Sequence, residues 1–253
     1  MDVILFFLIL GVVQGTLEWL PVSSSGNVTL LIAHYTEMSL SEAVKVSFFL
    51  HGGTMLSVCV KFRSQLVTLT RDALSFNRTP ILNFYIAATG MSAVLGIPIY
   101  LLLEVEIPER SGSLIIAFFL FMTGVIIKIQ KKGLKSLTEV TVRDALIVGA
   151  AQAIAVIPGI SRSGMTISAM LSRGITQEEA LQMSFLLSIP PVLGLMIVGV
   201  SHFHWLYLLS MAVAFAFSLL SMEILLKAAQ RLNFSYFCFA IAFLTVLAVV
   251  LFY

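Results

Sequence analysis

Two short polar stretches interrupt otherwise apolar segments, and they hold the residues best able to do chemistry. The interruptions are residues 19–27, WLPVSSSGN, and residues 157–165, IPGISRSGM. With the polar residues beside them, we call 14–27 the first tip and 157–166 the second tip. Their proline, glycine and serine residues do not continue a helix, and lipid does not tolerate unpaired backbone groups. Ionisable side chains in such surroundings are costly unless paired or hydrated, so Glu18 and Arg162 are functional candidates by default.

The first tip combines a carboxylate with a run of hydroxyl groups. Gln14 and Glu18 are four residues apart, so on a helix they share a face. Their side-chain oxygens suit a divalent cation such as Mg²⁺ or Ca²⁺. The other polar side chains at this tip are Ser23, Ser24, Ser25 and Asn27. The alternative is that Glu18 only pairs with a basic group across an internal interface.

The second tip centres on Arg162, whose planar guanidinium is always charged and matches phosphate oxygens. Small residues around it would let backbone N–H groups converge at a helix N-terminus, which favours anions. These neighbours are Gly159, Ser161, Ser163 and Gly164, with Thr166 following. The alternative is an ion pair between Arg162 and Glu18 that only locks two halves of the protein together, and one arginine could serve both roles.

His51 is the remaining polar residue of interest, in the sequence LHGGT at 50–54. It could approach the tips if that end of its helix reaches the polar cavity. A buried histidine with a satisfied hydrogen bond is the preferred interpretation.

Composition shows what must position these residues. Of the 253 residues, 59% are hydrophobic and only 11% are charged, whereas soluble domains carry about 25% charged residues. A soluble protein of this size could not hide so much apolar surface, so we predict a polytopic membrane protein. The formal net charge of +2 implies no nucleic-acid partner. No basic residue precedes Lys45, so we expect no cleavable signal peptide.

Six apolar runs are long enough to span a bilayer as helices. They are 44–60, 81–103, 113–127, 183–200, 205–226 and 234–253. Two further segments, 1–33 and 142–172, are broken at the tips and fit re-entrant helical hairpins. The predicted fold is therefore an all-α integral membrane domain with six spanning helices and two re-entrant hairpins.

The loop charges predict the orientation of the spans. Basic residues dominate 61–80, 128–144 and 227–233, which the positive-inside rule places in the cytoplasm. The acidic loop 104–112 and the short loop 201–204 then lie outside, and all six spans alternate without conflict.

An internal repeat relates the two halves of the chain. A shift of 138 residues superposes Gly11 on Gly149, Gln14 on Gln152 and Ser23 on Ser161, and a shift of 137 superposes Ser47 on Ser184. Repeat one covers 1–127, a cytoplasmic linker covers 128–141 and repeat two covers 142–253. Because corresponding spans run in opposite directions, the repeats are predicted to be inverted, with both tips near the bilayer midplane.

At these tips the chain resembles the bacitracin-resistance family, the undecaprenyl-diphosphate phosphatases. The first signature, Q-G-x-x-E-W-L-P-V-S-S-S-G, matches 14–26, and the second, P-G-x-S-R-S-G-x-T, matches 158–166. The likeness in length, repeats and hydropathy covers essentially the whole chain. The resemblance implies a cell-membrane hydrolase, with a divalent-metal requirement and an outward-facing active site, that converts a long polyprenyl diphosphate to the monophosphate carrier lipid and inorganic phosphate.

The resemblance also implies roles for individual residues. Glu18 and Gln14 match the acidic motif expected to hold the metal, Ser24 matches the hydroxyl motif, and Arg162 matches the phosphate-binding motif. Substrate contacts are expected from Ser23, Ser25, Asn27, Gly159, Ser161, Ser163 and Thr166.

Asn27 departs from the family, which usually has a histidine directly after S-S-x-G. Asparagine donates a hydrogen bond to a phosphate oxygen but does not shuttle a proton near neutral pH. Ser24 or a metal-activated water is then the expected nucleophile, with Glu18 as base or metal ligand. His51 is a candidate substitute for the missing imidazole.

Two rival functions share the same residues. A flippase would move a polyprenyl phosphate without hydrolysis, because inverted repeats with broken helices are typical of transporters. An ion-coupled carrier for a small anion would need a water-accessible cavity without an opening to lipid. The expected partners are the lipid substrate and the membrane, and we keep a homodimer as a further hypothesis.

Overall fold

The computed structural model describes residues 2–20, 23–102, 135–157, 160–198 and 204–231, with separate positions inside 114–128 and 235–250. In these ranges the chain forms α-helices and connecting segments and no β-strand, so the predicted all-α class is confirmed. The predicted spans 113–127 and 234–253 lie largely outside the described residues.

Four helical segments of the described chain are long and apolar enough to cross a membrane. They are Glu42–Lys61, Pro80–Leu102, Gln177–Ile197 and Trp205–Ala228. These segments coincide with four of the predicted spans, and the protein is therefore a multi-pass membrane protein.

The predicted span 183–200 is interrupted in the structure. Helix α9 (Gln177–Leu187) ends before Ser188, and helix α10 (Ile189–Val198) follows directly. Pro190 and Pro191 have no backbone N–H to donate to the preceding turn, which explains the interruption.

The chain divides into two compact units, each built from two separate stretches. Unit one comprises Met1–Arg63 and Ser188–Leu225, and unit two comprises Ser64–Leu187 and Leu226–Tyr253. Each unit takes residues from both predicted repeats, whose boundaries stay a prediction.

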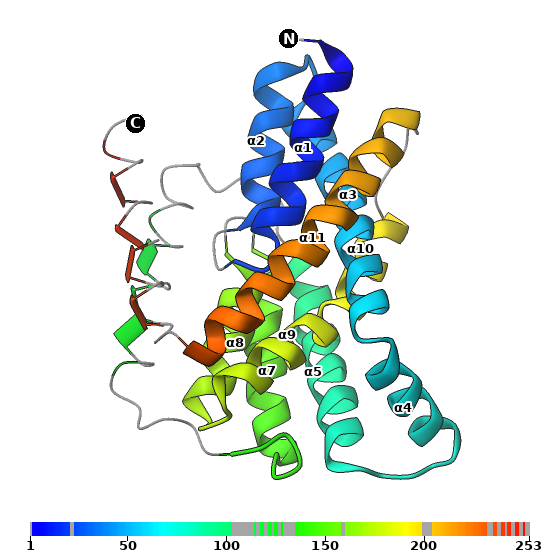
Figure 1. The fold of residues 1–253 in the computed structure, drawn as a ribbon, viewed down its shortest axis with the longest axis vertical. Helices are drawn as coiled ribbons and strands as arrows, with labels where there is room; N and C mark the ends of the chain where they lie inside the picture. The colour runs from blue at the N-terminus through cyan, green and yellow to red at the C-terminus, as the bar shows by residue number, and fades with distance from the viewer. Residues whose placement is uncertain are drawn as a thin grey trace. The chain divides into compact units, whose positions relative to one another are not determined.

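Unit one contains the broken hairpin that carries the first tip. Helices α1 (Val3–Leu17) and α2 (Ser24–Tyr35) lie side by side, and both pack against α3 (Leu40–Lys61), as Figure 1 shows. Each helix of the hairpin is too short to span a bilayer alone. The buried core of this unit consists of Phe6, Phe7, Leu10, Val28, Ile32, Ala43, Val46, Leu50, Leu206 and Tyr207.

Helix α11 (Trp205–Arg231) fixes the position of α1 through backbone-close packing. A Cβ atom at Gly11 would lie 2.6 Å from the carbonyl oxygen of Ser210, and one at Gly15 would lie 2.5 Å from that of Ala214. Glycines spaced four apart let helices approach closely in membranes, where packing rather than hydrophobicity drives association. The Ser221 hydroxyl adds a hydrogen bond of 2.8 Å to the Gly15 carbonyl.

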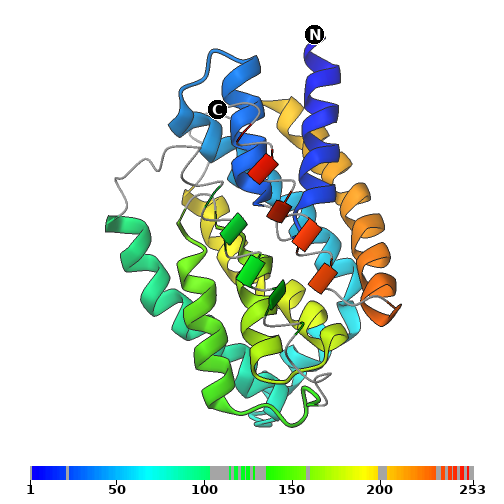
Figure 2. The same ribbon diagram turned by 90° about the vertical axis from the view of Figure 1, so that its left-hand side faces the viewer.

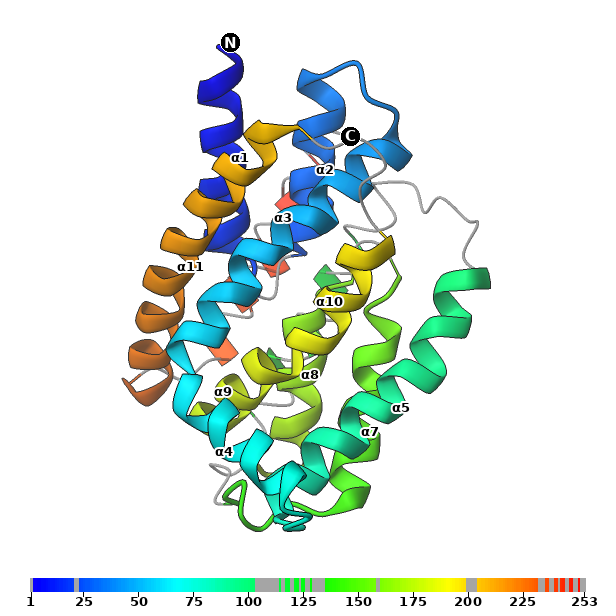
Figure 3. The ribbon, with the colours of Figure 1, turned by 90° about the vertical axis from the view of Figure 1, so that its right-hand side faces the viewer.

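Unit two contains the hairpin that carries the second tip. Helix α7 (Val142–Ile154) lies beside α5 (Pro80–Leu102), and α8 (Arg162–Ser172) packs against α7 and α9 (Figures 2 and 3). A Cβ atom at Gly149 would lie 2.4 Å from the Ala88 carbonyl oxygen, so α7 also uses a glycine for close approach. Both broken segments therefore fold as helix–break–helix, as predicted.

Asp144 ties the start of α7 to the end of α8. Its fully buried carboxylate accepts a hydrogen bond from Lys135 and one of 2.7 Å from Arg173, and it caps α7 together with Thr141. Burial opposes ionisation of this carboxylate. The hydrogen bonds from Lys135, Arg173 and Thr141 outweigh burial and hold the pKa of Asp144 well below its usual range.

The loop predicted for 61–80 contains a helix that sequence reasoning missed, α4 (Arg63–Leu74). It follows α3 after a single residue, Phe62, and its side chains are mostly exposed apart from Leu69. The missed signal was the helical spacing of its leucines among polar residues.

Candidate active site

The end of α1 presents two polar side chains on one face. Helix α1 ends at Leu17, and the backbone N–H of Glu18 still donates to the Gln14 carbonyl. This continuing helical turn places Gln14 Nε2 2.9 Å from Glu18 Oε2. Both residues are buried, Gln14 completely and Glu18 with 7% of its surface exposed. The predicted shared face is confirmed.

The start of α2 has an unusual backbone. Ser23, just before the helix, has φ = +47°, in the left-handed region that non-glycine residues seldom occupy. The Asn27 side chain donates a hydrogen bond of 3.0 Å to the Ser23 carbonyl and so holds this conformation. Asn27 therefore has a structural contact at the position where the sequence predicted a substrate contact. Such strain concentrates at functional sites.

The N-terminus of α2 lacks a side-chain cap. The Ser23 side chain makes no capping hydrogen bond, and within the described residues its buried Oγ has no partner. A Cβ atom at Gly26 would lie 3.1 Å from this Oγ, which places the hydroxyl over the first turn of the helix. The first N–H groups of a helix have no intrahelical acceptor, so this end attracts anions.

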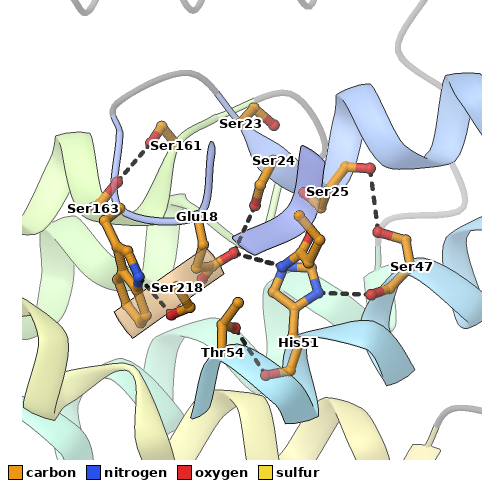
Figure 4. A network of polar contacts seen from close by, with 12 residues as sticks. Glu18, Ser23, Ser24, Ser25, Ser47, His51, Thr54, Ser161, Ser163 and Ser218 are labelled. Atoms are coloured by element: carbon orange, nitrogen blue, oxygen red, sulfur yellow. Dashed lines mark hydrogen bonds and ion pairs between the residues drawn. The ribbon is translucent and has the colours of Figure 1, made fainter. Parts of the chain in front are cut away.

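The Glu18 carboxylate is the centre of the first tip. Its Oε2 atom accepts a hydrogen bond of 2.9 Å from Gln14 Nε2. The same atom accepts a hydrogen bond of 2.6 Å from Ser24 Oγ and lies 3.1 Å from His51 Nε2 (Figure 4). A serine hydroxyl within hydrogen-bond reach of a carboxylate is the arrangement of a nucleophile and its base. Three of the residues singled out by sequence thus meet at one atom.

His51 joins this group from α3. It is buried and its Nδ1 lies 2.7 Å from the Ser47 carbonyl oxygen, as expected for a satisfied core histidine. Its Nε2 also contacts Glu18, so the alternative that this end of α3 approaches the first tip holds beside the preferred interpretation. The sequence signal for this contact was a histidine inside an apolar span. No periodic pattern linked its position on the helix to the first tip.

A second set of polar contacts supports the first tip, and sequence reasoning missed it. The Trp19 indole N–H donates 2.8 Å to Ser218 Oγ on α11, and Ser218 in turn contacts Ser57 on α3. Single serines inside apolar helices look like filler in the sequence, yet here they hold the completely buried Trp19. The contact fixes the residue next to Glu18.

The second tip is built in unit two around the start of α8. Ser161 caps the helix through a hydrogen bond of 3.3 Å from Gly164 N, and its Oγ lies 3.1 Å from Ser163 Oγ. Arg162 NH1 donates 2.9 Å to the Ser184 carbonyl on α9. Thr166 Oγ1 lies 2.7 Å from Ser184 Oγ. The predicted residues of this tip thus come together, except Gly159, which lies outside the described residues.

The first tip offers only a few side-chain ligands for a metal ion. Among the described residues no group of three His, Cys, Asp or Glu side chains is arranged to hold an ion. Within the same residues, the buried Gln14 Oε1 accepts no hydrogen bond. An amide oxygen of this kind fits a hard cation that takes its remaining ligands from a substrate and water.

Comparisons with known proteins agree with these observations. Residues 7–248 match the family described as bacitracin resistance protein BacA. The chain is 36% identical to the undecaprenyl-diphosphatase of Methanococcoides burtonii, covering 96% of this chain and 97% of that protein. It is 34% identical to the undecaprenyl-diphosphatase of Methanothrix thermoacetophila, covering 94% of each. It is 36% identical to that of Methanopyrus kandleri, covering 90% of this chain and 89% of that protein.

Proposed function

The chain belongs to the bacitracin resistance protein BacA family, and we propose that it hydrolyses undecaprenyl diphosphate at the first tip, with Ser24 as nucleophile and Glu18 as base. The products are the monophosphate carrier lipid and inorganic phosphate. The observation that carries this assignment is the 2.6 Å hydrogen bond from Ser24 Oγ to the buried Glu18 carboxylate.

The reaction proceeds in two displacements at the terminal phosphorus. Ser24 Oγ attacks, its proton passes to Glu18 Oε2, and the bridging P–O bond breaks to release the monophosphate lipid. Water then attacks the phosphoserine, the P–Oγ bond breaks, and Glu18 returns its proton to Ser24 Oγ, while the protons of the water leave with the inorganic phosphate or pass to bulk water. Glu18 takes the serine proton only as bonding to phosphorus acidifies the hydroxyl.

The uncapped N-terminus of α2 supports binding of the terminal phosphate beside Ser24. The Ser23 hydroxyl and the backbone N–H groups of the first turn are donors that need no rearrangement to meet a phosphate. Because Ser24 is the first residue of this helix, its Oγ would lie next to a phosphate bound there.

Arg162 serves as a second phosphate ligand in this proposal. Its NH1 donates to the Ser184 carbonyl, which fixes the guanidinium at the start of α8. A guanidinium held in one orientation neutralises the negative charge that develops on the phosphoryl oxygens during transfer. That the two tips meet at the bilayer midplane stays a prediction from the sequence.

A divalent cation, Mg²⁺ or Ca²⁺, is part of the proposal. Gln14 Oε1 and the Glu18 carboxylate would hold it, together with diphosphate oxygens, and it would supply neutralisation of the diphosphate charge. We propose further that the enzyme lies in the cell membrane and that its active site faces outward, as the loop charges and the family suggest.

The test is phosphate release by the purified protein from undecaprenyl diphosphate in detergent with Mg²⁺, followed by acid quenching and peptide mass analysis. We expect turnover and a phosphorylated peptide containing Ser24. Turnover without phosphoserine, even under rapid quenching, would point to water as the nucleophile. Tight lipid binding without any release would favour the flippase, which neither the family nor the names of the relatives support.

A further inference from the structure

The contacts of His51 determine where its hydrogens lie. A backbone carbonyl only accepts, so the 2.7 Å contact between His51 Nδ1 and Ser47 O requires a hydrogen on Nδ1. Nε2 lies 3.1 Å from Glu18 Oε2, and two acceptors cannot face each other at that distance without a hydrogen between them. One hydrogen therefore lies between the imidazole and the carboxylate.

The imidazole itself is held rigidly. Ser47 and His51 lie one turn apart on α3, so the Nδ1 contact locks the ring to its own helix. Ser47 Oγ donates to the Ser25 carbonyl at 3.3 Å, which connects the same turn to the start of α2. His51 is 6% exposed, so protein atoms surround the ring on nearly all sides.

From this geometry we propose that His51 is a positioning residue of the phosphatase reaction, which holds Glu18 Oε2 toward the Ser24 hydroxyl. A glutamate side chain rotates about its χ angles unless hydrogen-bond donors hold its carboxylate. Here Gln14 Nε2 and His51 Nε2 both lie close to Glu18 Oε2, the oxygen that accepts the hydrogen bond from Ser24. The proposal rests on the proposed function of Ser24 and Glu18. In this arrangement α3 supplies an imidazole next to the proposed base. The chain has Asn27, not a histidine, directly after Ser23–Gly26.

The experiment compares two replacements of His51. His51→Gln keeps an amide N–H that can reach Glu18, whereas His51→Leu fills the space without a donor. We expect His51→Leu to lower kcat about 10–100-fold with little change in KM, as for other orienting partners, and His51→Gln to stay within about 10-fold of the wild type. Thr54→Val is the matched control, because the Thr54 hydroxyl only bonds the His51 carbonyl one turn along α3.

A double-mutant cycle with Glu18→Gln separates positioning from folding. If His51 acts through Glu18, His51→Leu has no further effect on the residual rate of Glu18→Gln. A general structural role would instead give additive losses, in which the fold-reductions in kcat of the two single variants multiply in the double variant. Thermal unfolding of every variant shows whether the two His51 replacements are equally stable.

Several outcomes would overturn the inference. Wild-type kcat in His51→Leu, equal loss in His51→Gln and His51→Leu, or additive losses in the cycle each contradict a donor acting on Glu18. Absence of phosphate release by the wild type contradicts the proposed function instead, so the two failures are distinguishable.

Discussion

The two tips share a scaffold but carry different functional groups. The shift of 138 residues that relates Gly11 to Gly149 and Gln14 to Gln152 also relates Ser24 to Arg162 and Glu18 to Val156. Ser24 is the first residue of α2 and Arg162 is the first residue of α8. Matching helix starts thus hold a hydroxyl beside a carboxylate at Ser24 and a guanidinium bound to a backbone carbonyl at Arg162.

The helix starts also differ in how they are capped. Ser161 caps α8 through Gly164 N, whereas the matching Ser23 leaves α2 uncapped and adopts a left-handed backbone. A capped helix with an anchored arginine is suited to hold charge, and an uncapped one with a base is suited to react. The comparison teaches that matching positions of the predicted repeat carry different functional groups and different helix caps.

The largest expected effect is loss of the hydroxyl at the reactive tip. Ser24→Ala should lower phosphate release at least about 10³-fold, because it removes the proposed nucleophile, whose hydroxyl lies 2.6 Å from Glu18 Oε2. Steady-state release of inorganic phosphate measures this. Ser64→Ala, at an exposed serine of α4, is the control. Residual activity above a tenth of wild type would shift the nucleophile away from Ser24.

A smaller loss is expected at the charged tip. Arg162→Lys should lower kcat/KM about 10–100-fold, because a point charge replaces a fork anchored on Ser184. Arg71→Lys on the exposed face of α4 serves as the matched control. If Arg162→Lys turns over like the wild type, only charge matters at this tip.

The stabilities of the two hairpins can be compared through the first turns of α1 and α7. By the same shift Phe6, a core residue of unit one, corresponds to Asp144. Phe6→Ala should cost about 3–5 kcal/mol of unfolding free energy through a cavity, and Asp144→Asn about 2 kcal/mol through lost charged hydrogen bonds. Thermal or denaturant unfolding in detergent measures both, with Glu37→Gln as a surface control.

The two losses should respond differently to pH. The folded state holds the pKa of Asp144 low, so its contribution is present above about pH 4 and is lost as pH falls through the folded value. The stability gap between wild type and Asp144→Asn should therefore close in acid, and the Phe6→Ala gap should not. A gap for Asp144→Asn that does not depend on pH would contradict the ionised network.

The matched glycines test whether the repeats share packing. Gly11→Val and Gly149→Val should each cost about 1–3 kcal/mol, because either side chain meets a carbonyl of the neighbouring helix. Gly90→Ala on α5 is the control, since nothing lies near its Cβ position and alanine favours the helix. If only one of the two glycine variants is destabilised, the two hairpins do not depend on the same close helix packing.

The smallest effect is expected at Asn27. Asn27→His should change kcat less than about 10-fold, because His51 already contacts Glu18 and Asn27 holds the Ser23 carbonyl. The same phosphate-release assay measures it. A gain of 100-fold or more would show that an imidazole at position 27 supplies chemistry that this chain lacks.

The sequence alone determined the membrane class, the two broken hairpins, four of the described spans and the pairing of Gln14 with Glu18. These follow from local rules, since apolar length selects a spanning helix, prolines and glycines break it, and residues four apart share a helix face. The internal repeat by itself pairs Ser24 with Arg162 as matching positions of the two tips.

Only the tertiary structure decided what surrounds Glu18. His51 comes from another helix, and Ser218, Ser210 and Ser221 act from α11 about two hundred residues away along the chain. No periodicity links residues on different helices, because their contact depends on how the helices pack and which glycines let them approach. The left-handed backbone of Ser23 was likewise decided by folding, whereas the interruption at Ser188 follows locally from Pro190 and Pro191.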